Sequence, residues 1–239
     1  MLKFNREKLL VIAPHPDDEV LGCSGLITKV KEAGGTVYVQ FIVVGNTKDF
    51  SRKGRSNAKE RTREIRSVMR YLRIDRYHIG FSERHHLRLD RIGQRSIMQL
   101  LERDSPVSIE RVKPTIVVYP SPYSYNQDHV IVARAAHATL RPAESATKHF
   151  VPTVLAFEVP ADDWSLHHQQ VPNYFVRLTQ REIETKRKAL TLYTSQVRPF
   201  PNPRSEQAVT ALAQLRGSLC DAPFAEAFLV YRHVSRDCV

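Results

Sequence analysis

The stretch His15-Pro16-Asp17-Asp18-Glu19 places an imidazole and adjacent carboxylates at one point of the chain. It directly follows the apolar run of residues 9–13, which predicts a buried strand bounded by a proline. A histidine and an aspartate three residues apart can share one hard or borderline metal ion. Asp17 then points elsewhere and can act as a base toward a water on that metal. A plainer interpretation is a charged turn in which Asp17 or Asp18 caps the next helix.

A second group, Asn126-Gln127-Asp128-His129, follows another apolar run and a loop marked by prolines. A metal that performs chemistry needs about three protein ligands and one open position for water. His15, Asp18 and His129 would supply two nitrogens and one oxygen. Asp128 could orient one of these ligands through a hydrogen bond. Taken alone, His129 is better explained as a cap or a surface residue, and its pairing with the first motif is what favours a ligand.

With these two motifs the chain resembles the PIG-L/LmbE-like deacetylases. These are zinc-dependent hydrolases that remove acetyl groups from N-acetylated amino sugars and related glycoconjugates. The family pattern after the first strand is Ala or Pro followed by His-Pro-Asp-Asp-Glu, and residues 14–19 fit it. Weaker matches follow in the family's order along essentially the whole chain: Val20-Leu21-Gly22-Cys23, Arg61 with Glu64, residues 126–129, residues 186–196 (KRKALTLYTSQ), Arg216-Gly217 and residues 225–228.

The resemblance implies that Zn²⁺, or another divalent metal, is held by His15, Asp18 and His129. Asp17 would be the general base for attack of a zinc-bound water on the acetyl carbonyl. One departure concerns Asn126, because many members of the family carry a histidine there that helps to stabilise the oxyanion. Asparagine can donate a hydrogen bond but carries no charge. Asn126 is therefore a candidate oxyanion donor, and the identity of the general acid stays open.

Positive charge is concentrated in the middle of the chain. The net charge is +11, and residues 52–113 hold 17 Lys or Arg against 8 Asp or Glu. Such a surface is consistent with simple solvation, with a phosphate-bearing or acidic substrate, or with nucleic acid. No nucleic-acid-binding signature accompanies the charge, so nucleic acid is the least favoured partner. Within this section, the resemblance implies that Arg61 binds a substrate hydroxyl or phosphate.

Composition agrees with one enzyme domain. A chain of 239 residues with 42% hydrophobic content can form a single domain over residues 1–239. No run approaches 18 apolar residues, and the amino terminus enters the first strand without an apolar signal segment. The three cysteines lack CxxC spacing and suggest neither disulfides nor a cysteine metal site. We therefore expect a cytoplasmic protein without a membrane span, and the oligomeric state is left open.

The order of apolar segments predicts an α/β fold with a mostly parallel, Rossmann-like sheet flanked by helices. Strands are expected at residues 9–13, 36–44, 77–81, 115–119, 153–159, 174–178 and 224–231. Helices are expected at residues 20–34, 59–76, 91–103, 130–140, 182–195 and 206–219. The proline-rich residues 198–204 predict an ordered loop or linker. No Gly-x-Gly-x-x-Gly follows the first strand, so a dinucleotide cofactor is not supported.

Two other classes of protein stay open. A non-catalytic sugar- or nucleotide-binding module would carry a structural metal, but such sites are usually closed by four ligands, which leaves Asp17 unexplained. A basic nucleic-acid-binding protein would lose affinity steeply with salt. Trp164 lies, with Asp162 and Asp163, in a loop near the substrate-facing segment that varies within the family. Core packing or a surface role explains Trp164 at least as well as stacking on a sugar.

Overall fold

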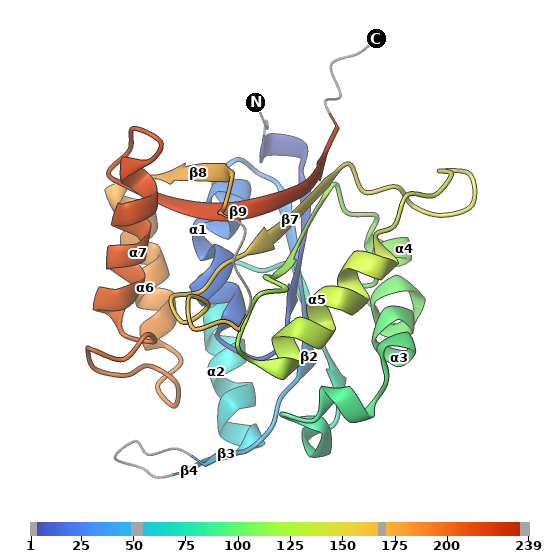
Figure 1. Cartoon of the computed structure of the whole chain (residues 1–239), viewed down its shortest axis with the longest axis horizontal. Coiled ribbons are helices and arrows are strands. Elements are labelled where there is room, and N and C mark those ends of the chain that lie inside the picture. Colours follow the sequence, from blue (N-terminus) through green and yellow to red (C-terminus); the bar gives the residue numbers. More distant parts are fainter. Residues whose placement is uncertain (1–3, 49–54, 167–170, 235–239) are drawn as a thin grey trace.

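The fold is built on one seven-stranded sheet with helices on both faces (Figure 1). The computed structural model describes residues 4–48, 55–166 and 171–234. The strand order is β5-β2-β1-β6-β7-β9-β8, and the first five of these strands are parallel, whereas β9 runs antiparallel to both neighbours. The strands are β1 (Lys8–Ala13), β2 (Thr36–Val43), β5 (Arg76–Phe81), β6 (Ile116–Pro120), β7 (Thr153–Phe157), β8 (Tyr174–Leu178) and β9 (Phe224–His233). The expected mostly parallel α/β sheet is thereby confirmed.

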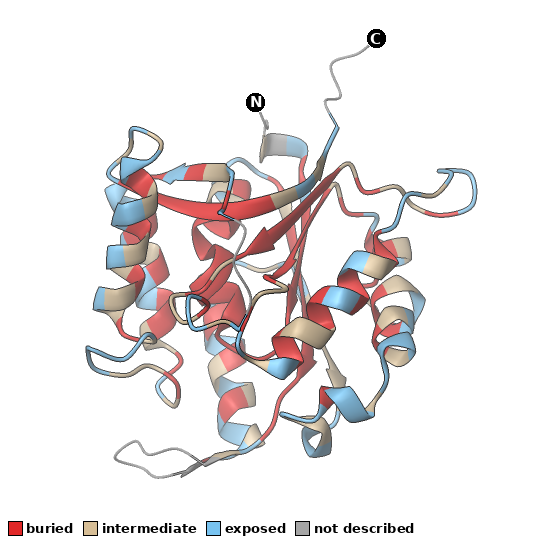
Figure 2. Cartoon of the chain, viewed as in Figure 1, coloured by how far each residue is buried: buried red, intermediate tan, exposed pale blue. Residues whose placement is uncertain are grey.

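Both faces of the sheet are buried, as Figure 2 shows. Side chains of β1 alternate between two apolar clusters: Leu9 and Val11 face one cluster, and Leu10 and Ile12 face the other. The first face is covered by α1 (Asp18–Glu32), α2 (Ala58–Tyr71), α6 (Gln180–Thr191) and α7 (Glu206–Ser218). The second is covered by α3 (Gln94–Gln99), α4 (Ile109–Val112) and α5 (Gln127–Thr139).

Local sequence signals explain where several helices begin. Asn57 and Glu60 form a reciprocal capping box at the start of α2, and Thr179 and Glu182 form one at the start of α6. At α7 the side chain of Ser205 accepts a hydrogen bond from the backbone N–H of Ala208. These caps fix the entry of each helix onto the sheet.

The structure differs from the expected elements at several places, among them the helix expected at residues 59–76, which ends at Tyr71, and the short helix α4, which was not expected. The helix expected at residues 91–103 begins three residues later, at Gln94, because Gly93 has a positive φ of 81°, and α3 continues directly into a π-helical turn, Leu100–Asp104. The helix expected from residue 130 begins at Gln127, since Asn126 caps it. A short antiparallel pair, β3 (Thr47–Lys48) with β4 (Arg55–Ser56), was not expected.

Within the described ranges, none of the helices is long and apolar enough to cross a membrane.

Candidate metal centre

The two sequence motifs meet at one edge of the sheet. Strands β1 and β6 are parallel neighbours, so their carboxyl ends lie side by side and the segments that follow them converge. His15, Asp18 and His129 are all buried there, and their ligand atoms lie within 4.8 Å of one another. The Oδ2 atom of Asp18 is 3.7 Å from Nδ1 of His15 and 3.3 Å from Nε2 of His129.

The chemistry of these three donors suits a divalent metal. Two imidazole nitrogens and one carboxylate oxygen form a set that Zn²⁺ and similar ions accept. Burial alone would raise the pKa of the Asp18 carboxyl, but the neighbouring His129 and His15 outweigh it and hold the pKa well below its usual range. Asp18 is thus kept in the ionised form that a metal ligand requires. The His15–Asp18–His129 group could therefore hold a metal ion.

Asp128 contacts His15, the ligand candidate of the first motif. Nε2 of His15 lies 2.9 Å from Oδ2 of Asp128, which leaves Nδ1 turned toward Asp18. The other oxygen of Asp128 accepts a hydrogen bond from the backbone N–H of Leu89 at 3.1 Å. Such a carboxylate fixes both the tautomer and the direction of a ligand histidine.

Asp17 is buried, but its carboxylate lacks hydrogen bonds to the described residues. It lies at the start of α1 in a left-handed conformation, with φ 99°, and its side chain is fully buried. Neither carboxylate oxygen makes a hydrogen bond to any described residue, and the nearest cation is Nε of Arg204, 3.4 Å from Oδ2. Burial raises the pKa of Asp17 above its ordinary value, and Arg204 opposes this shift. Backbone strain and an unpartnered buried carboxylate are both features of reactive sites.

Glu19 and Tyr193 support the turn that carries Asp17. One oxygen of Glu19 accepts the backbone N–H of Asp17 at 3.1 Å, and the other accepts the hydroxyl of Tyr193 at 2.6 Å. Burial raises the pKa of Glu19 to about 8, although the Tyr193 hydrogen bond works against this shift. Tyr193 belongs to the segment of residues 186–196 that the family resemblance singled out, so that segment reaches the site through its tyrosine.

Arg61 is a buried residue that contacts the loop of the first motif. The residue is only 1% exposed, and its guanidinium donates to the carbonyl oxygens of Gly45 at 3.3 Å and Pro16 at 3.2 Å. It also lies 3.1 Å from Nε2 of His86, whose ring packs edge-on against His15. In this structure Arg61 therefore holds the loop of the first motif. Its contact with a substrate hydroxyl or phosphate stays a prediction.

Asn126 is the amino-terminal cap of α5. Its side-chain oxygen accepts the backbone N–H of Asp128 at 3.0 Å, and the residue is half-buried. The bond places Asp128 and His129 on the first turn of the helix, where both reach the metal centre. The oxygen of Asn126 is thus engaged in capping, and its amide group is the part that could donate to an oxyanion.

No site role was predicted for three side chains that lie near the site, although Asp162 was placed in a loop near the substrate-facing segment. Arg204 extends from the proline-rich loop to Asp17, and its side chain remains 39% exposed. Asp162 is buried near His129, and burial raises its pKa to about 6. His86 is kept neutral, because burial and the positive charges around it lower its pKa to about 3. For Arg204, the sequence offered one signal, its place in the proline-rich residues 198–204. That signal did not indicate which residue Arg204 would contact.

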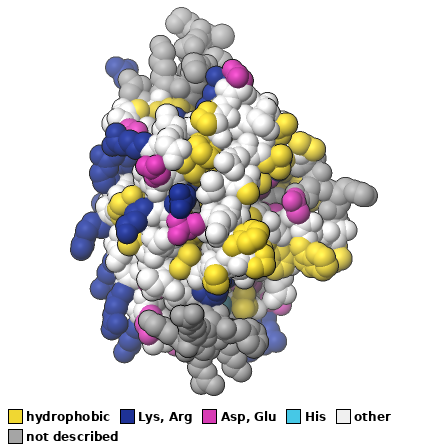
Figure 3. Space-filling model, turned by 90° about the vertical axis from the view of Figure 1, so that its left-hand side faces the viewer, with side chains coloured by type: hydrophobic (Ala, Val, Ile, Leu, Met, Phe, Trp, Pro, Cys, Tyr) yellow, Lys and Arg dark blue, Asp and Glu magenta, His cyan; other side chains and the backbone are white. Residues whose placement is uncertain are grey.

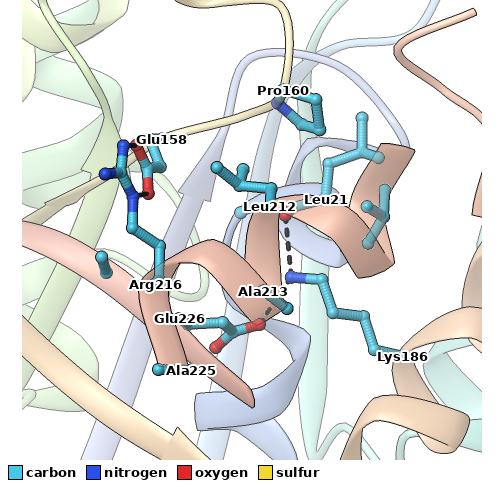
Figure 4. A pocket seen from close by; sticks show the side chains of 12 residues that line it. Leu21, Glu158, Pro160, Lys186, Leu212, Ala213, Arg216, Ala225 and Glu226 are labelled. Carbon is cyan, nitrogen blue, oxygen red and sulfur yellow. Dashed lines mark hydrogen bonds and ion pairs between the residues drawn. The ribbon is translucent and has the colours of Figure 1, made fainter. Parts of the chain in front are cut away.

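A second buried cluster of charge lies beside the first turns of α1 (Figure 4). Nζ of Lys186 lies 2.6 Å from Glu226 and donates to the carbonyl oxygen of Leu21 at 2.8 Å. The Glu226 carboxylate also accepts the backbone N–H groups of Gly25 and Leu26, each at 2.8 Å. We call these residues the Lys186–Glu226 cluster.

The Lys186–Glu226 cluster holds a break in α1. Cys23 departs from helical geometry with φ −151°, so the carbonyl and N–H groups around it need other partners. Lys186 supplies a donor before the break, and Glu226 supplies acceptors after it. A Cβ atom at Gly25 would lie 2.6 Å from a methyl group of Leu178 and 2.9 Å from the carboxyl carbon of Glu226, so a larger residue would displace these side chains. The cluster therefore helps to aim the first turn of α1, which carries the metal-centre carboxylates.

The sheet and the group His15, Asp18 and His129 together define an α/β protein with a candidate metal-binding site at the carboxyl edge of its strands. The family model for PIG-L, described as GlcNAc-PI de-N-acetylase, matches residues 10–140. The chain belongs to this family. That matched region includes His15, Asp18 and His129, so the family match and the geometry point to the same part of the molecule.

Three known proteins are similar to this chain, one in sequence and two in structure. An uncharacterised deacetylase from Escherichia coli K12, YaiS, is 23% identical over 80% of this chain and 92% of its own length. N,N'-diacetylchitobiose deacetylase from Pyrococcus horikoshii is 21% identical with a TM-score of 0.69, over 97% of this chain and 87% of that one. GalB, the 4-carboxy-2-hydroxymuconate hydratase of Pseudomonas putida KT2440, is 18% identical with a TM-score of 0.71, over 98% of this chain and 100% of that one. The two structural likenesses show a shared fold.

Proposed function

We propose that this protein is a metal-dependent N-deacetylase that releases acetate from an N-acetylated amino sugar or glycoconjugate. The observation that carries the proposal is the fully buried carboxylate of Asp17, which makes no hydrogen bond to a described residue and lies 3.4 Å from Arg204, beside three side chains that could hold a metal ion. A site with three ligands and an adjacent free base is the arrangement that metal-assisted hydrolysis needs. Membership of a de-N-acetylase family supports the same reaction.

In this proposal His15, Asp18 and His129 hold one divalent metal, with Zn²⁺ as the expected ion. A metal bound there would supply Lewis acidity toward the acetyl carbonyl and lower the pKa of a nearby water. Asp17 takes the proton of the attacking water, and burial raises the pKa of its carboxyl above the ordinary value. Asp128 keeps His15 in the orientation that a ligand needs.

The remaining groups act on the acetyl oxygen and on the leaving amine. The amide of Asn126 donates a hydrogen bond to the oxyanion as the carbonyl becomes tetrahedral. Asp17 returns its proton to the amine, so one carboxylate serves in turn as base and acid. Arg61 binds a hydroxyl or phosphate of the substrate in the proposal drawn from the family resemblance. Arg204 is the more exposed guanidinium of the site, and we assign it a share of that role.

We propose further that the deacetylase domain spans residues 1–239. The family model covers residues 10–140, and the elements beyond it, β7, β8 and β9, continue the same sheet. Residues from these later segments, Tyr193 and Arg204, contact the turn of Asp17 and Glu19. The carboxyl-terminal third is thus part of the site's surroundings. The expected cytoplasmic location belongs to the same proposal.

The fold alone does not define the reaction, because a hydratase shares it. The decisive experiment combines metal analysis with acetate release from a panel of N-acetylated amino sugars and disaccharides. We expect one divalent ion per chain and measurable acetate. In His15→Ala and His129→Ala proteins, metal content and acetate release should both fall sharply, because two ligands do not retain an ion that three hold.

His85→Ala provides a matched control, since His85 lies in contact with Arg84 and outside the ligand group. It should keep both metal and activity. Full metal occupancy in both ligand variants would contradict the ligand assignment. A metal-loaded protein that binds the sugars without releasing acetate would favour a binding module. Binding of nucleic acid that weakens steeply with salt would favour the nucleic-acid alternative.

A further inference from the structure

A hollow with basic side chains in its lining lies at the edge of the sheet opposite the candidate metal centre. It measures about 540 Å³, and its lining includes Lys8, Tyr38, Asp75, Arg76 and Arg111. We call these five residues the basic hollow. β1 begins at Lys8 and β5 begins at Arg76, whereas the metal centre follows the other end of β1. Five residue steps along β1 separate the two edges by about 17 Å, so a small ligand in the basic hollow does not reach the metal centre.

The register of the strands turns three of these side chains to the same face of the sheet. Tyr38 of β2 lies opposite Leu10 of β1 on one side and opposite Arg76 of β5 on the other. Opposed residues of neighbouring strands share a face, and so do residues two apart on one strand, such as Lys8 and Leu10. This is the second face, which α4 also covers, and α4 contributes Arg111 to the same hollow. The basic hollow is therefore assembled from four segments that are far apart in the sequence.

The three basic side chains of the hollow lack an acidic partner among the described residues, because no ion pair includes Lys8, Arg76 or Arg111. Asp75 is the acidic member of the hollow, but its Oδ2 atom already accepts Nζ of Lys31 and a backbone N–H group, each at 2.7 Å. The hollow therefore gathers positive charge that the described part of the chain does not neutralise.

Several basic side chains on the other face of the sheet are paired with carboxylates. Figure 3 views the molecule from the side of α6 and α7 and shows Asp and Glu side chains among the Lys and Arg side chains. Arg187 of α6 lies 3.2 Å from Glu206 of α7, and Lys29 of α1 lies 2.8 Å from Glu182 of α6. Such a pair neutralises its own charge, whereas the basic hollow offers three cations to an anion from solution.

We propose that the basic hollow binds a small molecule that carries a diphosphate group, at a site separate from the metal centre. Phosphate oxygens match the planar fork of a guanidinium, and Arg76 and Arg111 supply two such groups beside the Lys8 ammonium. Nε of Arg111 donates to the carbonyl oxygen of Arg103 at 3.3 Å, which holds this side chain and leaves its terminal N–H groups available to a ligand. The ring of Tyr38 lines the same hollow and offers a surface to a planar base joined to the diphosphate.

The shape of the hollow favours a small molecule over nucleic acid. Its volume lies within the usual range of small-molecule sites. A groove for a nucleic-acid strand instead follows the backbone over several nucleotides and combines positive charge with successive aromatic rings. The lining of this hollow contains one aromatic ring, that of Tyr38. The inference does not depend on the proposed deacetylase function, since none of the five residues belongs to the metal centre.

Calorimetric titration of the metal-loaded protein with inorganic pyrophosphate and with ADP tests the proposal. Arg76→Ala and Arg111→Ala should each raise the Kd of both probes by about 5- to 10-fold, the loss of a charge-assisted hydrogen bond. Arg66→Ala is the matched control, because Arg66 is exposed on α2 and does not line the hollow, and it should leave Kd unchanged. Tighter binding of ADP than of pyrophosphate, lost in Tyr38→Leu, would identify the ligand as a nucleotide. Equal affinities would show that the diphosphate alone is recognised.

Pyrophosphate could also bind the metal itself, and His129→Ala separates the two sites. A diphosphate held in the basic hollow should keep its Kd in His129→Ala protein. Loss of binding in that variant, with full binding in Arg76→Ala, would place the anion at the metal centre and overturn the proposal. The absence of saturable binding would also overturn it, as would single-stranded DNA that binds more tightly than ADP and depends equally on Arg76. Because Arg76 and Arg111 are exposed, their variants should keep the wild-type thermal midpoint without ligand.

Discussion

The metal centre and the Lys186–Glu226 cluster are both buried and charged, but they differ in how far their charged groups are hydrogen-bonded. In the cluster, Lys186 contacts Glu226 and a carbonyl oxygen, and Glu226 accepts two backbone N–H groups. At the metal centre, both oxygens of Asp17 lack hydrogen bonds to described residues. A fully bonded cluster stabilises one conformation, whereas a buried carboxylate without hydrogen bonds is available for chemistry. The contrast separates the residues that hold α1 from the residue that would react.

The largest expected effect comes from Asp17→Asn. This variant should keep its metal but lose about 10²–10⁴-fold in kcat, the usual range for removal of a general base. Its stability should match or exceed that of the wild type, because a buried charge without hydrogen bonds is replaced by a neutral group. Acetate release, metal content and thermal midpoint measure the three quantities.

Asp90→Asn is the matched control, since Asp90 is an exposed aspartate outside the ligand group, and it should change none of these three quantities. A kcat within a few-fold of wild type for Asp17→Asn would place the base elsewhere and remove the contrast between the two regions.

Glu226→Ala should act mainly on stability. It leaves the Lys186 ammonium and two backbone N–H groups buried without their partner, so the free energy of unfolding should fall by about 3–5 kcal/mol. Denaturant unfolding measures this change. Glu206→Ala removes a comparable ion pair, with Arg187 at 3.2 Å, from an exposed position and should cost less than about 1 kcal/mol. Similar losses of stability in the two variants would show that the Lys186–Glu226 cluster stabilises the protein no more than an exposed ion pair does.

Asn126 has two proposed roles, as the cap of α5 and as an oxyanion donor, and two substitutions distinguish them. Asn126→Ala should lower kcat by roughly 10²-fold through loss of an oxyanion donor and should also destabilise the protein by about 1 kcal/mol through loss of the cap. Asn126→Ser retains a capping oxygen and should lose only the rate, because its side chain is shorter. If the serine variant keeps full kcat, Asn126 shapes the helix start and donates nothing to the reaction.

Tyr193→Phe should have the smallest effect. It removes the hydroxyl that lies 2.6 Å from Glu19 and leaves one buried carboxylate oxygen without its donor, at a cost of about 1–3 kcal/mol in stability. The rate should fall by less than tenfold, since Tyr193 supports the turn of Asp17 without contacting the substrate. Tyr71→Phe, at an exposed tyrosine, is the control and should leave both unchanged. A loss of rate as large as that of Asp17→Asn would move Tyr193 into the reactive group.

Much of the architecture could be predicted because burial on both faces of a sheet leaves a strong local signal. The run of residues 9–13 and the strand at Tyr174–Leu178 were read from apolar patterning alone. The convergence of His15, Asp18 and His129 was also expected, since parallel neighbouring strands end at the same edge. The start of the helix expected at residues 91–103 was placed three residues too early, because the pattern does not reveal the positive φ at Gly93.

The parts of the site that escaped prediction depend on contacts between distant segments. Arg204 and Asp17 are brought together only by the closure of the whole fold, and no local spacing marks them as partners. The same holds for His86 beside Arg61. Residues that belong to one motif could be found from the sequence. Residues that are distant in the sequence and meet only in the folded protein could not.

The hydrogen bond from Gly25 to Glu226 joins residues 201 positions apart. Protein synthesis begins at the amino terminus, so the first motif leaves the ribosome long before this partner exists. Strand β8 also lacks a neighbour until β9 enters between it and β7. A nascent or truncated chain therefore carries the candidate metal ligands before anything holds the break in α1. Because metal sites rarely exist before folding, capture of the ion is tied to completion of the chain.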